Sequence, residues 1–457
     1  MPTDYATFLS NKQQVGGQHG FEPVFLPDCL FPFQRHLSEW EIRKGRCATF
    51  AACGLGKTLL ELVKAQNIVQ YTNGRVLILT PIAVAQQFAT EGQKFGIEVK
   101  LSRDGKVGGS GIYISNYERL HLFSPNDFTG LLGDESGCLK DFDGVRKAEV
   151  TEFMRTLPYR SLYSATAAPN DFDELGTHSE ALGELGYQDM VSKFFKQVTQ
   201  KDLLGWGRTK YKLRAYAQTM FWQWVCSWAR ACRKPSDLGF SDEGFDLPPL
   251  DIQEHNVTPR TLALGVLFDS GARTLQEQQA EQRRTLTERC EKVAELANAV
   301  KHPVVCWCNL NDEGDLLEKL IPDAVQISGA DSDDEKEEKL LAFVRGEARS
   351  MISKSKLTGY GLNWQHCYHH IYFPSHSFSD WHQSVRRSWR FGQTHEVRVD
   401  IVTTDGNAGV LANLKRKQEQ AEEMFTKLVQ YMNDSLRIDR SQYGKVKELI
   451  PSWLKPQ

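Results

Sequence analysis

The stretch Ala51-Ala52-Cys53-Gly54-Leu55-Gly56-Lys57-Thr58 carries the strongest signal in this chain. The glycines let successive backbone N–H groups point into one concavity, which suits phosphate oxygens. The lysine that follows reaches the outer phosphates of a nucleotide triphosphate, and the threonine hydroxyl is a ligand for Mg²⁺. The pattern therefore predicts a phosphate loop for ATP, with binding residues Gly54, Gly56, Lys57 and Thr58.

The residues on both sides of this loop fit such a site. Residues 47–50 are typical of a brief apolar strand, and residues 59–65 have the spacing of an amphipathic helix. Because the short pattern is specific only between a strand and a helix, these flanks favour a phosphate loop over a chance glycine turn.

Length and composition limit the class of protein. A chain of 457 residues suits about three domain-sized units, and 40% hydrophobic residues suffice for real cores. Lys and Arg number 55 against 58 Asp and Glu, so attraction to nucleic acid must come from local patches. Ten scattered cysteines, no basic and apolar start and no membrane-length apolar run lead us to expect a reduced cytoplasmic protein without a membrane segment.

Two sets of short apolar segments alternate with helical patterns. Such alternation predicts α/β lobes with parallel sheets, which bind ligands at the carboxyl ends of their strands. The first set is 76–81, 112–117, 131–135 and 161–166, and the second is 304–308, 324–328, 350–353, 370–373 and 397–402.

This pattern divides the chain into four parts. We expect a first lobe over 1–255, a helical connector over 256–300, a second lobe over 301–404 and a helical tail over 405–457. A basic helical insertion is expected within the first lobe, at about 171–240.

Residues 191–236 of that insertion are strongly basic, with ten cations against the single anion Asp202. Nine aromatic side chains lie between the charges. A basic surface with apolar anchors suits a polyanion, and Lys210, Lys212 and Arg214 are our candidates for such contacts. The alternative is a helical insertion with solvated cations, and for the tryptophan-rich part an ordinary core is the favoured interpretation.

Adjacent acids follow a strand end at Gly133-Asp134-Glu135-Ser136. Phosphoryl transfer needs charge neutralisation and a positioned water, so we expect Asp134 to hold Mg²⁺ together with Thr58, and Glu135 to act as the base. An isolated Asp-Glu pair is usually a surface turn. The functional interpretation of this pair depends on the phosphate loop upstream and on the strand before it.

Arginines cluster in the segment 383–393, Gln-Ser-Val-Arg-Arg-Ser-Trp-Arg-Phe-Gly-Gln. Arg387 and Arg390, three residues apart, project from one helical face and are expected to reach the γ-phosphate across a cleft. A solvated basic helix is the alternative for any one of them.

The ordered set of motifs resembles superfamily 2 helicases (DEAD/DEAH-box type) of the Swi/Snf-like branch, most closely the compact DNA helicases of phages and prophages. The resemblance covers about residues 20–404, and Gly392-Gln393 after the arginines indicates the branch. Its motifs are Phe33-Gln34, GLGKT at 54–58, LTP at 79–81, ISNYE at 114–118, DESG at 134–137, SAT at 164–166, TGYGLN at 358–363 and QSVRRSWRFGQ at 383–393.

The resemblance implies two RecA-like lobes and roles for matching positions. Gln34 would read the adenine, and Arg387 and Arg390 would be the arginine fingers. Gly361 and Asn363 would lie at the cleft between the lobes. The path of the nucleic acid would include Pro81, Tyr117, Thr358 and Gly359.

Two positions depart from the family pattern. Ser136-Gly137 stands where many relatives have Ala-His or Gly-His, which puts the link from hydrolysis to motion through that histidine in doubt. Arg386 replaces the usual glycine before the first finger, which leaves open which arginine acts.

The expected function is an ATP-dependent DNA helicase or translocase that converts ATP to ADP and phosphate, in phage-type replication, recombination or repair. Its partners would be DNA, preferably double-stranded, and replication or recombination proteins, and it would act as a monomer. The alternatives are an RNA-directed helicase of the same superfamily and a nucleotide-dependent DNA-binding recruitment module that does not translocate.

A zinc site is the competing interpretation of the crowded residues His366, Cys367, His369, His370 and His376, followed by His382. Their spacing matches no closed structural site, and we therefore do not expect a metal there.

Overall fold

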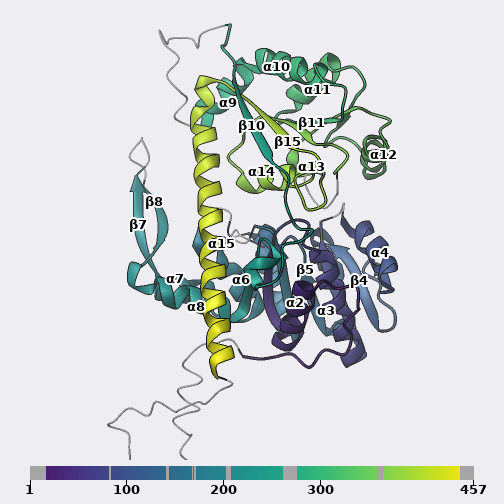
Figure 1. Cartoon of the computed structure of the whole chain (residues 1–457), viewed down its shortest axis with the longest axis vertical. Helices are drawn as coiled ribbons and strands as arrows, with labels where there is room; N and C mark the ends of the chain where they lie inside the picture. Colours follow the sequence, from purple (N-terminus) through teal and green to yellow (C-terminus); the bar gives the residue numbers. More distant parts are fainter. Residues whose placement is uncertain are drawn as a thin grey trace, which may run out of the picture.

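A computed structural model describes residues 17–81, 84–139, 144–166, 168, 171–201, 207–260, 275–358 and 364–442. Figure 1 shows two α/β lobes, one above the other, with the long helix α15 (Ala408–Gln442) running beside both. The expected class, α/β with two parallel sheets, is confirmed.

The first lobe contains a seven-stranded sheet of parallel strands in the order β3-β4-β2-β5-β6-β1-β9. Its central strands are continuous apolar runs, as burial on both faces requires; residues 76–79 of β2, for example, are fully buried. The strands are β1 (Arg46–Ala51), β2 (Arg75–Thr80), β3 (Val99–Leu101), β4 (Gly111–Asn116), β5 (Gly130–Gly133), β6 (Tyr159–Ser164) and β9 (Ala229–Cys232). The helices are α2 (Pro32–Lys44), α3 (Lys57–Thr72), α4 (Ala85–Lys94), α5 (Val145–Thr156), α6 (Leu175–Leu182), α7 (Tyr187–Phe194) and α8 (Gln218–Trp228).

The second lobe contains a six-stranded parallel sheet in the order β10-β15-β14-β11-β13-β12. One apolar cluster lies on each of its faces. The strands are β10 (Leu250–Asn256), β11 (Val304–Trp307), β12 (Ala324–Ile327), β13 (Ser350–Ser353), β14 (His369–Tyr372) and β15 (Val397–Thr403). The helices before α15 are α9 (Leu275–Arg284), α10 (Leu286–Asn298), α11 (Asn311–Leu320), α12 (Asp333–Val344), α13 (Ser355–Thr358) and α14 (Phe378–Val385).

The division expected between the lobes is wrong at β10. This strand falls within the range 1–255 that was assigned to the first lobe, but it pairs with β15 along its whole length in the second sheet. The connector is helical where it is described, yet α10 contributes Cys290 and Val293 to a core of the second lobe. The second lobe therefore begins at β10, and α10 is one of its covering helices.

The basic insertion is not wholly helical, which corrects a second expectation. Strands β7 (Phe195–Lys201) and β8 (Gly207–Leu213) form an antiparallel hairpin that is a sheet of its own. The alternation of polar with β-branched and aromatic residues in these strands favours a hairpin over a helix. The tryptophans of α8 are buried in the core, as favoured from the sequence: Trp222, Trp224 and Trp228.

Helix α15 belongs to both lobes. Near its start, Leu411, Leu414 and Ala421 are part of a core cluster of the second lobe. Farther along, Met424 and Leu428 join the core of the first lobe, where α15 packs against α8 and β9. One continuous helix therefore crosses from one hydrophobic core to the other.

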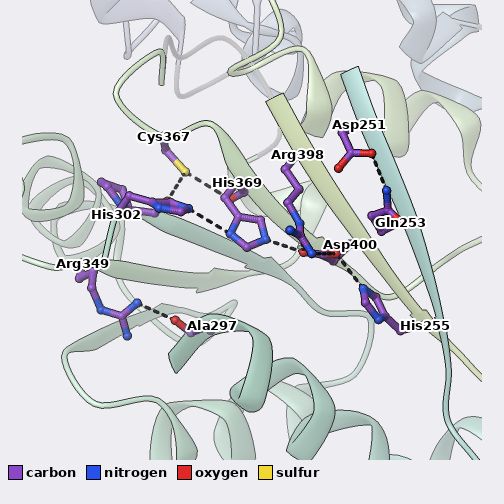
Figure 2. Close-up of polar contacts among 11 residues, drawn as sticks. Asp251, Gln253, His255, Ala297, His302, Arg349, Cys367, His369, Arg398 and Asp400 are labelled. Carbon is purple, nitrogen blue, oxygen red and sulfur yellow. Dashed lines mark hydrogen bonds and ion pairs between the residues drawn. The ribbon is translucent and has the colours of Figure 1, made fainter. Parts of the chain in front are cut away.

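Asp400 cross-links three neighbouring strands of the second sheet (Figure 2). Its buried carboxylate accepts hydrogen bonds from His369 Nε2 at 2.6 Å and His255 Nε2 at 2.7 Å, which lie on β14 and β10. Arg398 adds bonds from Nε and Nη2, both 2.9 Å long. Burial alone would raise the pKa of Asp400, but these hydrogen bonds hold it well below its usual range. The largely exposed strand β10 is thus attached by polar side chains as well as by its backbone.

We predict that Asp400→Asn destabilises the protein by about 3 kcal/mol at pH 7, because it breaks a buried, charge-assisted network. Since the pKa of Asp400 is lowered by folding, this contribution is present above the unfolded pKa near 4 and is lost as pH falls below it. Urea unfolding at several pH values measures it. The matched control is Asp251→Asn on β10, whose partly exposed carboxylate accepts from Gln253. Equal stability of the two variants at pH 7 would contradict the prediction.

Among the described residues, no helix has both the length and the apolar character needed to cross a bilayer.

Candidate active site

The site lies at the carboxyl ends of the strands of the first sheet. β1 leads into the phosphate loop, and β5 leads directly into Asp134 and Glu135. Strand β6 lies between them in the sheet, and β2 lies on the other side of β5. The segments singled out in the sequence at 51–58, 79–81, 134–137 and 164–166 therefore meet at one edge, where parallel sheets bind ligands.

The loop has the backbone that its sequence predicts. Gly54 and Gly56 have φ values of 91° and 80°, which side chains rarely tolerate. A Cβ at Gly56 would also collide with the amide of Gln34. That amide donates to Leu55 O at 3.0 Å and accepts from Phe31 N at 3.1 Å. The side-chain amide of Gln34 thus lies against the loop, with its nitrogen bonded to Leu55 O and its oxygen bonded to Phe31 N. To bind an adenine, this amide would exchange one of these two hydrogen bonds for a bond to the base.

Lys57 is the first residue of α3, directly after the loop. Its Nζ donates to Ala51 O at 3.1 Å, which folds the side chain back over the loop. Although burial lowers it, the nearby Cys53 thiol and the carboxylates of Glu135, Asp134 and Glu61 raise the pKa of Lys57 above its ordinary value. Lys57 therefore carries its charge at the position where phosphates would bind, and the neighbouring Thr58 is partly exposed beside it.

Asp134 is buried, and its carboxylate and carbonyl oxygens accept three hydrogen bonds. Its Oδ2 accepts from Thr80 Oγ1 at 2.9 Å and its Oδ1 from Glu135 N at 2.8 Å. The Asp134 carbonyl accepts from Tyr117 at 2.6 Å. Burial, followed by the charge of Glu135, raises the pKa of Asp134 to about 7 despite the opposing effect of Lys57. Together with the Thr58 hydroxyl, this carboxylate would supply the hard oxygen ligands that Mg²⁺ prefers.

Glu135 joins the first lobe to the second. Its backbone is in the left-handed region, at a φ of 48°, which is costly for a residue with a side chain. Its Oε2 accepts a hydrogen bond from Gln383 Nε2 of α14 at 3.0 Å. Gln383 begins the arginine-containing motif at 383–393, but the sequence gives it no role, and only the fold reveals that it reaches the acid.

The segment after α14 packs on the phosphate loop. A Cβ on Gly54 would lie 3.1 Å from the ring of Phe391 and 3.6 Å from Cβ of Arg390. The ring of Phe391 also meets Phe245 edge-on, with centroids 5.4 Å apart. Residues 390–391 therefore lie within contact distance of the loop, and glycine at position 54 allows this approach.

The three arginines of this segment lie in different environments. Arg387 is 3% exposed, and its guanidinium carbon is 5.7 Å from the centre of the Trp364 ring, within the second lobe. Arg390 is partly buried beside Gly54. Both expected fingers therefore come from the segment that meets the loop, with Arg390 the nearer to Gly54.

Arg386, which the sequence left as an ambiguity, also faces the loop. Its guanidinium carbon stacks 4.2 Å from the centre of the Trp389 ring, and its Nε and Nη1 are buried without a hydrogen bond among the described residues. Burial lowers the pKa of Arg386, and the Cys53 thiol of the loop acts against this. Buried donors of this kind are suited to an anion.

The residues proposed to bind nucleic acid lie in different environments. Lys210 and Lys212 are exposed on β8. Arg214 instead donates from Nη1 to Ser192 O at 3.2 Å and to Lys193 O at 3.3 Å. These hydrogen bonds connect the end of the hairpin to α7. Tyr117 is 4% exposed with its hydroxyl on Asp134, so it contacts the acid turn and not the surface.

Several other candidates have little or no described structure. Pro81 is partly exposed at the end of β2. Thr358 ends α13, and its side chain is not described. Gly359, Gly361 and Asn363 lie outside the described residues.

Three histidines of the segment 366–382 have separate partners in the fold. His369 bonds to Asp400, His370 accepts from Trp307 Nε1 at 3.0 Å, and His376 pairs with Asn413 at 3.1 Å. Within the described ranges, no three side chains of the metal-binding types converge on one point.

Comparison with known proteins adds no assignment. The chain matches no protein-family model, and no curated protein is significantly similar to it. The geometry of the site therefore carries the functional argument.

We predict that Asp134→Asn stabilises the protein at pH 8, by roughly 5 °C in Tm. The folded pKa of about 7 lies above the unfolded value near 4, so ionisation of Asp134 costs stability as pH rises between these values. The gain from Asn should grow from about pH 4 to pH 7 and then stay constant in thermal unfolding. Asp127→Asn, at a more exposed carboxylate, is the control, and an Asp134→Asn variant no more stable than wild type at pH 8 would disprove the assigned environment.

Proposed function

We propose that this chain is an ATP-dependent DNA translocase of the helicase type, in which ATP and Mg²⁺ bind between two RecA-like lobes. The observation that carries the proposal is the contact of Glu135 with Gln383, beside the packing of Phe391 on Gly54. The phosphate loop and the acids come from one lobe, and the arginines come from the other. A composite site of this kind makes nucleotide binding sensitive to the arrangement of the lobes.

Each side chain has a role in the hydrolysis of ATP. Glu135 accepts a proton from the attacking water as the water oxygen bonds to the γ-phosphorus and the bond from the γ-phosphorus to the β,γ-bridging oxygen breaks, leaving ADP. Lys57, Arg387 and Arg390 offset the negative charge that spreads over the transferred group. Thr58 and Asp134 would hold Mg²⁺, which would offset the negative charge of the phosphates.

Arg386 is an additional candidate for this charge-stabilising role. It stacks on Trp389, which fixes the plane of the guanidinium, and its buried Nε and Nη1 are donors without a protein partner among the described residues. The site thus combines three cations from one segment with a phosphate loop from the other lobe, which supports nucleotide turnover coupled to movement of the lobes.

The hairpin β7–β8 supports DNA as the partner. Lys196 lies directly opposite Lys212, and Lys210 is two residues from Lys212, so the three share one face. The opposite face carries Phe195, Tyr211 and Leu213, which pack on the core. Like charges directly opposite each other are unfavourable in a hairpin, and a phosphate backbone would relieve the repulsion.

We predict that Lys57→Ala abolishes ATP hydrolysis, because it removes the cation of the loop, whereas Lys94→Ala on the exposed side of α4 leaves it unchanged. Glu135→Gln should bind ATP but hydrolyse it at least about 100-fold more slowly, as expected for loss of a general base. Phosphate release measures hydrolysis, and a fluorescent ATP analogue measures binding. Turnover near the wild-type rate in Lys57→Ala would refute the assignment.

The same assay identifies the partner. Duplex DNA should stimulate hydrolysis more than single-stranded DNA or RNA, and preferential stimulation by RNA would favour the RNA-directed alternative. Displacement of the third strand from a DNA triplex tests movement along duplex, and a recruitment module would bind the triplex without displacing that strand.

We predict that replacing Lys196, Lys210 and Lys212 by Gln weakens DNA binding and lowers the slope of log K against log salt by about 3, because the variant neutralises three fewer phosphates. Fluorescence anisotropy at several salt concentrations measures this slope. A matched triple variant at the exposed residues Lys94, Lys301 and Lys319 should retain the wild-type slope. An unchanged slope in the hairpin variant would exclude the hairpin from the DNA-binding surface.

A further inference from the structure

The turn after Asp134 holds its catalytic candidate in a conformation that needs support. Glu135 has a φ of 48°, and left-handed residues other than glycine cost about 1–3 kcal/mol and persist only where neighbours fix them. On one side, Glu135 N donates to Asp134 Oδ1 at 2.8 Å. On the other side follows Ser136, which is fully buried. The contacts of Ser136 therefore decide how firmly the turn is held.

Ser136 bonds to a histidine from a distant part of the chain. Its Oγ lies 3.1 Å from Nε2 of His178, a fully buried residue of α6. The edge of the His178 ring meets Phe50, with ring centres 5.8 Å apart, on the strand that leads into the phosphate loop. His178 therefore connects the acid turn to the strand before the phosphate loop.

The roles of donor and acceptor follow from the neighbours of His178. Burial lowers the pKa of His178 to about 4, so the ring is neutral at physiological pH, with one donor and one acceptor nitrogen. Nδ1 lies 3.5 Å from the carbonyl of Glu174, which can only accept. Nδ1 thus carries the proton, and Nε2 accepts a hydrogen bond from the Ser136 hydroxyl.

The same turn packs on the end of the next strand. A Cβ on Gly137 would lie 3.5 Å from Thr166 O and 3.7 Å from Ser164 Oγ. Ser164 Oγ in turn accepts from Thr166 N at 3.0 Å. Residues 136–137 are therefore fixed between α6 and residues 164–166, and the bond to His178 is the side-chain contact that anchors Ser136.

We propose that His178 is a positioning residue: through the Ser136 hydroxyl it holds Glu135 in its left-handed conformation, so that the carboxylate is set toward the attacking water. The inference rests on the proposed ATPase function and adds a residue that the motifs do not contain. It also gives Ser136 a buried histidine partner, although neither of the two residues directly after Glu135 is a histidine.

Steady-state ATP hydrolysis with saturating duplex DNA tests the inference. Ser136→Ala and His178→Phe should each lower kcat about tenfold and leave KM for ATP within about twofold. The reason is that they release the Glu135 carboxylate from its position and leave the phosphate loop unchanged. The double variant should lose no more than either single variant, since one bond is removed in all three. His178→Gln, whose amide oxygen replaces the Nε2 acceptor, should recover most of the rate. Because the ring is neutral well above pH 4, the ratio of variant to wild-type kcat should stay constant from pH 6 to pH 9.

A merely structural role would change other quantities. It would raise KM and lower Tm together, and His178→Gln would not recover kcat; that pattern overturns the inference. If His178→Phe fails to fold, Ser136→Ala decides alone, and an unaltered kcat in that variant overturns the inference. Absence of turnover in the wild type would overturn the proposed function together with this inference, whereas normal wild-type turnover with unaltered variants would overturn the inference alone.

Discussion

Gln383 and Glu135 are 248 residues apart in the chain, and the hydrogen bond between them joins two sheets that share no strand. The proposed composite site depends on this bond, since each lobe by itself carries only half of the candidate residues. The first lobe has the loop, the lysine and the acids, and the second has the arginines. Because the bond ends on the candidate base itself, a change in the relative position of the lobes reaches the reacting group through a single side chain.

The site is built at the expense of stability. Burial and the neighbouring Glu135 keep the pKa of Asp134 near 7, and Glu135 has a strained backbone. Glu61, one helical turn after Lys57, is buried with neither carboxylate oxygen hydrogen-bonded among the described residues, and burial raises its pKa well above the ordinary value. Several buried carboxylates beside a single lysine lower the stability of the folded protein unless bound cations offset their charge. Such a conflict between stability and function is usual at active sites.

The sequence predicts the parts of the fold that depend on local patterns. The apolar runs of the two sheets, the glycine loop and the core tryptophans all follow from spacing and burial. The sequence pattern does not predict strand β10, because its residues are largely exposed. Its side-chain attachment to the sheet also depends on Asp400, almost 150 residues later in the chain. The contacts of Tyr117 and Arg214 depend in the same way on other parts of the chain: Tyr117 bonds to Asp134, and Arg214 bonds to residues of α7. The roles of Gln383, Arg386 and His178 likewise depend on contacts that no local pattern encodes.

Helix α15 restricts how the lobes can move. Its 35 residues span about 52 Å, and between Ala421 and Met424, within a single turn, the helix passes from one core to the other. Pulling the lobes apart along the helix would strip apolar side chains from one of these cores. Rotation of one lobe against the other would have to bend the helix or remove the same contacts, because the helix packs into both cores. Separation of Gln383 from Glu135 is therefore opposed by the apolar contacts of α15 as well as by their own hydrogen bond.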